Sequence, residues 1–397
     1  MKRQQYISAQ ELGEKWGISK RRVNQLCADG RIPGAQKVGQ SWTIPADVRK
    51  PADLRAYPKE KAWVGPKPGN LMPLMNTSFA PGCCLKAAKA MEKGPQRDIA
   101  LAEYHYFSGQ PEAAASEMER YLASGDMQVR LSACFIYAYA SLPMGRIQQA
   151  QAALGELETA LSSAGCLRPE FRAASAFVAV AGAVLLHLPL PEEVPDAEAC
   201  LLLLPPGLRA FALYVQAHYL YLKGEYAHSA GIVTATLAMG ASNYPIPAIY
   251  LHLAAVMDYM SLKQPERAKA HLLEAWAIAQ PDDLIEGFGE HHGLLGGMLE
   301  SVIKPQWPGD FKRMIDITYR FSAGWRRIHN PITGHSVADD LSTTEFAIAM
   351  LAARDWTTQE IAEHMHISAN TVKTHISETM RKLGVKNRKA LKQYMLQ

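Results

Sequence analysis

The sequence lacks the features that mark a membrane or exported protein. None of its apolar runs reaches the roughly 18 residues that a transmembrane helix needs, and Phe177–Leu188 is too short to span a bilayer. The N-terminal stretch Met1–Leu12 has no apolar signal core. The six cysteines show no CxxC spacing. We expect free thiols, with a redox switch or a metal site at Cys83-Cys84 as the alternative. These absences predict a cytoplasmic protein with no membrane partner.

Motifs for catalysis are also missing. The chain has no G-x-x-x-x-G-K-[ST] loop to hold phosphates, no H-E-x-x-H zinc motif and no G-x-S-x-G nucleophile elbow. Glu290-His291-His292 does not replace the zinc motif, because adjacent side chains on a helix point about 100° apart. We therefore expect no cofactor, no metal and no enzyme activity. An enzyme would need a convergent polar site that the sequence does not show.

What the sequence does contain is a strong pattern at its C-terminal end, over Leu341–Gln397. Two helical stretches flank the short break His366–Ala369, and Ser368 is placed to cap the second one. The first stretch carries Ala362, which is small enough for a close approach of the two helices. The second stretch is polar and basic. A support helix, a tight turn and a basic helix are typical of a helix-turn-helix that binds in the major groove of DNA.

These residues also resemble the LuxR-type, or GerE-type, helix-turn-helix, over about 57 residues. The positions that carry the resemblance are Glu345, 359–362, 367–368, 371–375, 382–385 and Arg388. The resemblance implies that base edges are contacted by Lys373, Thr374 and Ser377. It implies phosphate contacts from Thr371, Arg381, Lys382 and Arg388. Ser368 and Asn370, at the start of the same helix, complete the predicted C-terminal site.

The family likeness has one further consequence, for assembly. It implies a last helix, Lys389–Leu396, that pairs two protomers, so a homodimer is expected. The alternative interpretation of the C-terminal pattern is a basic amphipathic helix pair that has no DNA partner.

A second pattern of this kind covers Tyr6–Arg55. Ser8 followed by Glu11 has capping-box spacing, so a helix is expected to begin there. Ser19 then caps a second, basic helix. A short hairpin with alternating inward residues is expected over 35–44. The order is therefore helix, turn, basic helix and hairpin.

This order resembles the winged helix of the excisionase or MerR type. The resemblance implies that the basic helix lies in the major groove and that the hairpin wing contacts the backbone or the minor groove. The implied DNA contacts are Lys20, Arg21, Arg22, Asn24, Gln25, Lys37 and Gln40. For Trp42 in the hairpin, a core position is favoured over a contact with DNA.

Charge is distributed in agreement with both patterns. Met1–Lys61 has 13 Lys and Arg against 6 Asp and Glu, a net charge of +7, and Ser342–Gln397 has 8 against 5, a net charge of +3. Since the whole chain has 42 against 38, the centre has 21 against 27, a net charge of −6. Two basic ends favour two contacts with double-stranded DNA, because neutralisation of phosphates drives affinity.

The centre, over 97–330, is rich in Ala and Leu and is patterned as helices. A turn residue followed by a helix with a small first inward residue recurs about every 36 to 40 residues, with a missing turn expected near position 185. The turn residues are Gly109, Gly145, Gly224 and Lys263. Each unit is expected to be a helical hairpin, and the hairpins stack because one alone cannot bury its apolar face. This pattern resembles a degenerate tetratricopeptide array.

Such an array implies a concave face for an effector, which is a peptide, a protein or a small molecule. The candidate lining residues are Tyr214, His218, Tyr221, Tyr250 and His252. Aromatic residues at helical spacing are more often core, and core packing is the favoured interpretation. The Pro-rich stretch 56–96 is expected to be a linker, part of which packs on the array because several of its residues are too apolar to remain in water.

The sequence therefore predicts a mainly α protein in four parts. These are a winged helix-turn-helix over 1–55, a linker over 56–96, an α-solenoid of tetratricopeptide-like hairpins over 97–330, and a four-helix LuxR-type helix-turn-helix over 338–397. The predicted function is sequence-specific transcriptional regulation, with two DNA-binding modules flanking an effector-binding or partner-binding domain. The alternative is an interaction scaffold in which only one terminal module binds DNA and the other docks a protein.

Overall fold

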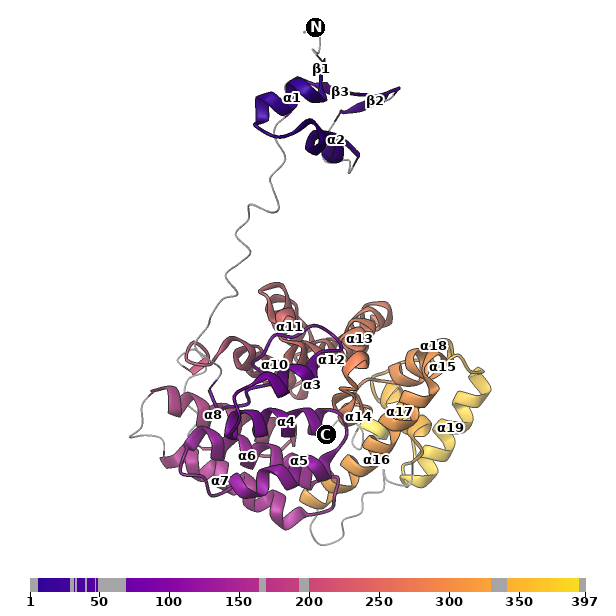
Figure 1. The fold of residues 1–397 in the computed structure, drawn as a ribbon. Coiled ribbons are helices and arrows are strands. Elements are labelled where there is room, and N and C mark those ends of the chain that lie inside the picture. Colours follow the sequence, from indigo (N-terminus) through magenta and orange to yellow (C-terminus); the bar gives the residue numbers. More distant parts are fainter. Residues whose placement is uncertain are drawn as a thin grey trace. The chain divides into compact units, whose positions relative to one another are not determined.

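The computed structural model describes residues 6–28, 32, 34–39, 41–46, 48, 69–163, 169–192, 200–329 and 341–392. The prediction of a mainly α protein is confirmed for these residues (Figure 1). The chain divides into two compact units, Met1–Lys67 and Pro68–Gln397. Among the helices in the described ranges, none is both long enough and apolar enough to cross a membrane.

The first unit combines two helices with a small antiparallel sheet. Its elements are β1 (Tyr6–Ser8), α1 (Ala9–Trp16), α2 (Lys20–Ala28), β2 (Gln36–Val38) and β3 (Ser41–Pro45). The predicted hairpin is β2–β3, and β1, which the sequence analysis did not anticipate, adds to β3 to give the order β1-β3-β2. Leu12, Val23 and Ile44 are fully buried between the helices and the sheet. Trp42 packs against this core, which is the position favoured for it.

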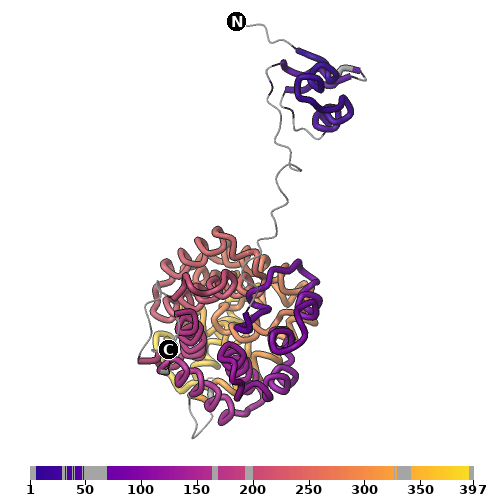
Figure 2. Tube along the Cα trace, turned by 60° about the vertical axis from the view of Figure 1, so that its left-hand side comes forward, coloured from indigo at the N-terminus to yellow at the C-terminus, as the bar shows by residue number. Residues whose placement is uncertain are grey.

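The second unit begins with a series of helical hairpins. Their helices are α3 (Cys84–Ala90), α4 (Pro95–Phe107), α5 (Pro111–Met118), α6 (Met127–Ser141), α7 (Ile147–Ser163), α8 (Pro169–Leu185), α10 (Pro206–Leu222), α11 (Tyr226–Ala238), α12 (Pro245–Ser261) and α13 (Pro265–Ala279). Short helical turns η1 (Glu119–Tyr121), η3 (Ala241–Asn243) and η4 (Gln280–Asp282) follow three of them. The first helices α4, α6, α8, α10 and α12 contact one another in sequence order, so the hairpins follow one another around the unit (Figure 2).

The predicted turn residues separate the helices of each hairpin. Gly109, Gly145 and Gly224 have φ angles of 76°, 70° and 79°. Lys263, at the equivalent place between α12 and α13, has a φ of 57° although it carries a side chain. This left-handed region favours glycine. A residue with a positive φ recurs at all four turns, which accounts for the regular spacing of turn residues in the sequence. The turn expected near position 185 is present as well, since α8 ends there and His187 has a φ of 54°.

The apolar part of the expected linker is built into the core of the second unit. Leu71, Met72, Leu74 and Met75 are all buried. The carboxyl oxygens of Glu103 on α4 accept hydrogen bonds from the backbone N–H groups of Leu74 and Met75 at 2.8 and 2.9 Å. The expectation that this stretch packs on the array is therefore confirmed. Residues 56–68 lie outside the described residues.

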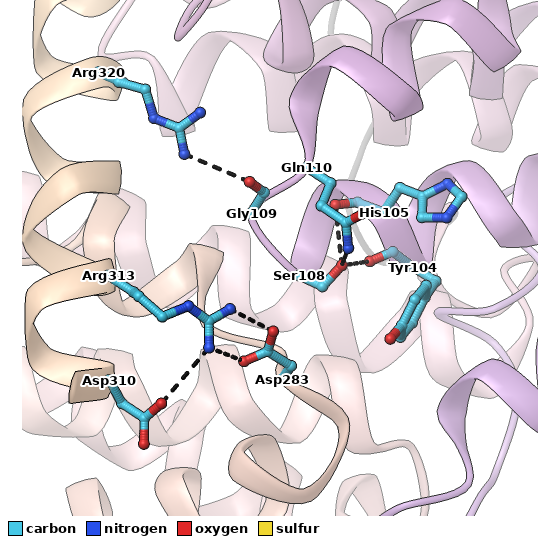
Figure 3. A network of polar contacts seen from close by, with 9 residues as sticks. All are labelled: Tyr104, His105, Ser108, Gly109, Gln110, Asp283, Asp310, Arg313 and Arg320. Carbon is cyan, nitrogen blue, oxygen red and sulfur yellow. Dashed lines mark hydrogen bonds and ion pairs between the residues drawn. The ribbon is translucent and has the colours of Figure 1, made fainter. Parts of the chain in front are cut away.

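A long helix, α16, crosses the turns of the first hairpins. It follows α14 (Glu286–Glu290), the π-helical turn η5 (Leu299–Ile303) and α15 (Lys304–Gln306), and spans Pro308–His329. Arg320 donates to the carbonyl of Gly109 at 3.4 Å, and Arg313 donates to Asp283 at 2.6 Å (Figure 3). Nearer its end, Gly324 lies against the backbone of Leu142 at the end of α6. α16 therefore holds the beginning and the end of the array together.

The last elements of the second unit share one apolar core with the array. They are α17 (Thr343–Ala353), α18 (Thr358–Met365), α19 (Ala369–Lys382) and the 3-10 helix η7 (Arg388–Leu391). Of the aromatic residues considered for a concave face, Tyr214, His218, Tyr221 and Tyr250 are buried. The core interpretation is therefore confirmed for these four, while His252 is half-buried and its Nδ1 lies 2.9 Å from Nδ1 of His271.

Candidate nucleic-acid interface

The geometry of α18, its turn and α19 follows from two caps and one left-handed residue. Thr357 caps α18 in a capping box with Glu360. His366 ends the helix in the left-handed region, with φ 56° and ψ 41°, and the chain turns before α19 begins at Ala369. Ser368 then caps α19, its Oγ accepting the N–H of Thr371 at 3.0 Å. Ile361 and Val372, one on each helix, are fully buried. The predicted support helix, turn and second helix are therefore present at the predicted residues.

One face of α19 is exposed and polar. The exposed residues on it are Asn370, Thr371, Lys373, Thr374, Ser377 and Arg381. The opposite face carries Val372, Ile376 and Thr379, which are buried. The exposed face begins at the capped N-terminus, where free N–H groups and the positive end of the helix dipole favour an anion. Six of the predicted DNA contacts thus share one surface of one helix, and Ser368 lies exposed at its start.

Three predicted phosphate contacts have partners within the domain. Lys382 is half-buried, and its Nζ lies 2.7 Å from the Glu345 carboxylate on α17. Arg388 donates to the carbonyl of Trp356, and Arg381 pairs with Glu378 at 2.8 Å. Their roles toward phosphate stay predictions. The helix predicted to pair two protomers, Lys389–Leu396, is described only in part. The 3-10 helix η7 ends at Leu391, and residues 393–397 lie outside the described residues.

In the first unit, the predicted basic helix is α2. Ser19 caps it, its Oγ accepting the N–H of Arg22 at 3.3 Å, and Val23, Leu26 and Cys27 form the buried face. The predicted contacts on the outer face are exposed (Lys20, Arg21, Gln25) or half-buried (Arg22, Asn24). Lys37 on β2 is exposed as well, and Gln40 lies outside the described residues. The arrangement is a second helix pair with a basic outer face, next to a hairpin.

Comparison with known proteins bears on the C-terminal elements. Residues 339–395 match the family described as bacterial regulatory proteins, luxR family. Over 48 residues the chain is 48% identical to the spore germination protein GerE of Bacillus subtilis (strain 168). Residues 339–395 form a LuxR-family helix-turn-helix domain. The aligned stretch covers 12% of this chain and 65% of that relative, so the chain spans just under two thirds of the relative's length. No solved structure matches the chain.

One buried arginine contributes to the docking of the LuxR-family domain on the array. Arg354, which ends α17, is 7% exposed and donates to the hydroxyl of Tyr221 on α10. It also donates to the carbonyl of Leu294 at 2.8 Å. Burial raises the pKa of the nearby Asp258 carboxyl to about 8, although Arg354 opposes this increase. A guanidinium placed in the array in this way joins the two domains at a defined position.

Two further contacts support this docking. Lys263, the turn residue with a left-handed φ, donates from Nζ to the carbonyl of Asp355 at 2.8 Å. His364 on α18 contacts the carbonyl of Gly296 through Nε2 at 3.0 Å. Burial lowers the pKa of His364, which keeps its imidazole neutral. The array therefore contacts α17 and α18, and it leaves the polar face of α19 exposed.

The sequence analysis missed this docking, although the sequence contained one signal for it. Residues 347–353 of α17 are all buried, so the helix has no polar face. A helix that is apolar on all sides needs to be buried on all sides. A small domain that stands alone does not have enough surrounding structure to bury a helix in this way. Arg354 and Tyr221 had no signal of their own, because their contact joins positions 133 residues apart.

Proposed function

We propose that the protein is a sequence-specific DNA-binding transcriptional regulator. In this proposal the LuxR-family domain and the N-terminal unit both bind DNA, and the helical array between them binds an effector or a partner. The observation that carries the proposal is the exposed face of α19, where six polar or basic side chains lie on a capped helix that packs against α18. A helix of this character is suited to the major groove, where each base pair presents distinct hydrogen-bonding groups.

Support for the second DNA contact comes from the first unit. α2 exposes Lys20 and Arg21, and the hairpin β2–β3 follows it in the same unit, an order that supports the proposed winged helix. The net charge of +7 over Met1–Lys61 favours a polyanionic partner. We therefore propose a winged helix for this unit and a tetratricopeptide-like array for residues 97–330. A homodimer that forms through the C-terminal end is part of the same proposal.

The experiment that tests the proposal is selection and sequencing of genomic fragments by the full-length protein. It is run beside the Lys373→Ala variant, the Arg21→Ala/Arg22→Ala variant and the control Lys312→Ala, whose side chain is exposed on α16 and is not one of the predicted DNA contacts. Replacement of Lys373 is expected to weaken binding to the selected site by about 1–3 kcal/mol.

The outcomes separate the two predicted functions. Enrichment of one composite site that either variant loses supports a regulator that reads DNA with both ends. Enrichment that only the Lys373→Ala variant loses would instead make the N-terminal unit a protein-docking element. Absence of enrichment for the wild-type protein, both alone and with cell extract as a source of effector, would contradict the regulator.

A further inference from the structure

An open cleft lies where the array holds the LuxR-family domain. It measures about 250 Å³ and is formed by the end of α8, the end of α10, the start of α11 and the segment before η5. Most of its wall residues are aromatic or apolar, among them Leu188, Tyr219, Leu222 and Tyr226, and His187 and Lys223 complete the lining. Leu222 is 36% exposed and Leu190 is 40% exposed, so apolar surface faces solvent within a concave site. An exposed apolar concavity of this kind is typical of a ligand-binding site.

A second, more apolar pocket continues from this cleft. It measures about 220 Å³ and shares Val184, Leu190 and Tyr219 with the first. Its remaining walls come from α8, α10 and the segment before α10, including Phe177 and Leu204. Together the two spaces reach the lower end of the range for small-molecule sites, which begins at about 300 Å³. One end of the combined site is therefore almost purely apolar.

The other end of the site carries a positive charge. Lys223 lines the cleft, and its Nζ lies 5.3 Å from the centre of the Tyr219 ring. None of the described residues that line either pocket is a carboxylate. Tyr221 lines the same cleft. A lysine beside phenol groups favours an anionic head, and the apolar extension favours a hydrocarbon tail.

The walls of the cleft include both residues that hold Arg354. Tyr221 and Leu294 line it, and the Tyr221 hydroxyl and the Leu294 carbonyl accept the hydrogen bonds of the Arg354 guanidinium. A ligand in the cleft would touch the same two residues that position the end of α17. A bound ligand and the docked LuxR-family domain would therefore both contact Tyr221 and Leu294. A ligand whose contacts depend on the position of these residues can couple the two sites.

We propose that this cleft binds a small amphipathic carboxylate and that its binding acts on the LuxR-family domain through Tyr221 and Arg354. The carboxylate pairs with Lys223, and the apolar tail enters the pocket lined by Phe177 and Leu204. The coupling rests on the proposed DNA-binding function, whereas the binding itself does not. The ligand class follows from one cation at one end of the site and apolar walls at the other.

Binding is tested on the full-length protein without DNA, by calorimetric titration with decanoate and with decan-1-ol, which has the same tail and no charge. Decanoate is expected to bind about fivefold more tightly than decan-1-ol, the effect of one solvent-exposed ion pair. Lys223→Gln should reduce the decanoate affinity to that of decan-1-ol, and Lys312→Gln, with the same charge change on α16, should not. Ala212→Phe, which fills the apolar pocket, should weaken both ligands.

Coupling is tested by hydrogen exchange over 343–365 with and without decanoate. Decanoate is expected to change exchange at the end of α17 in the wild type and not in Tyr221→Phe. An unchanged pattern in the wild type with bound decanoate would contradict the coupling.

Equal binding of the two ligands, or binding that Lys223→Gln leaves intact, would contradict the carboxylate site. If decanoate fails to bind while genomic fragments are still enriched, the cleft proposal fails and the regulator stands. If decanoate binds and no fragment is enriched, the regulator fails instead.

Discussion

Lys382 Nζ lies 2.7 Å from Oε2 and 3.0 Å from Oε1 of Glu345, which joins the end of α19 to the start of α17. The side chains are 26% and 9% exposed. Glu345 also accepts the N–H of Ser342 at 2.7 Å in the capping box of α17. Burial alone would raise the pKa of Glu345, but the hydrogen bonds from Lys382 and Ser342 lower it below its usual value. The ion pair is thus part of the internal structure of the LuxR-family domain.

The first prediction is that Lys382→Met destabilises this domain. The Glu345 carboxylate would lose its cation while remaining largely buried, so the free energy of unfolding should fall by about 1–2 kcal/mol. Urea unfolding measures the loss. Lys373→Met is the control, because this lysine is exposed on the same helix and should leave the stability unchanged. Wild-type stability together with a shallower salt dependence of DNA affinity would assign Lys382 to phosphate binding instead.

The second prediction concerns α2. If Arg21 and Arg22 contact phosphates, Arg21→Ala/Arg22→Ala should weaken DNA binding and reduce the salt dependence. The slope of log affinity against log salt should decrease in magnitude by about 0.9 for each phosphate contact that is lost. Titrations at several salt concentrations measure the slope, and Lys312→Ala provides the matched control. A slope that stays the same would exclude α2 from phosphate contact.

The third prediction compares two glycines of α16. A Cβ added at Gly324 would overlap the backbone carbonyl of Leu142, whereas at Gly309 nothing lies within 4 Å. Gly324→Ala should therefore destabilise the second unit by about 1–3 kcal/mol, because backbone atoms cannot move aside at low cost. Gly309→Ala should be neutral or slightly stabilising, since it only reduces the freedom of the unfolded chain. Thermal unfolding of both variants tests this, and equal melting temperatures would contradict the close contact of α16 with α6.

The fourth prediction is a pH dependence that arises from Glu103. Burial raises its pKa from 4.5 to about 8 in the folded protein, against the effect of the N–H groups of Leu74 and Met75. Because the folded state holds this proton more tightly, the stabilisation is complete below pH 4.5 and is lost as the pH rises to about 8. Glu103→Gln removes this group. The difference in unfolding free energy between wild type and variant should change by up to about 1.4 kcal/mol per pH unit in that range. Urea unfolding at several pH values measures this difference, and a constant difference would contradict the raised pKa.

Local features of this protein could be predicted from the sequence because they depend on neighbouring residues. The predicted caps Ser8, Ser19 and Ser368 each accept a backbone N–H three residues ahead, so their spacing alone indicates a helix start. The turns at Gly109 and Gly224 follow from one left-handed residue each. Tyr214, His218, Tyr221 and Tyr250 were correctly expected in the core, because their spacing places them on the inner faces of their helices.

Contacts between residues that lie far apart in the sequence could not be predicted from it. Nothing near Arg354 in the sequence indicates that its partners are Tyr221 and Leu294, and nothing near Lys382 indicates Glu345. β1 was missed for a related reason. It has three residues and becomes a strand only because β3, more than thirty positions later, offers its free edge.

The amino-acid sequence by itself therefore determined the mainly helical character of the chain, the predicted caps and turns and the LuxR-family character of residues 339–395, since each of these depends on short-range geometry or on a local motif. Only the tertiary structure decided that the LuxR-family domain shares a core with the array and that Arg354 enters it beside the cleft. The physical reason is that burial of a helix on all sides, and the partner of a buried charge, are set by surfaces that meet only when the chain is folded.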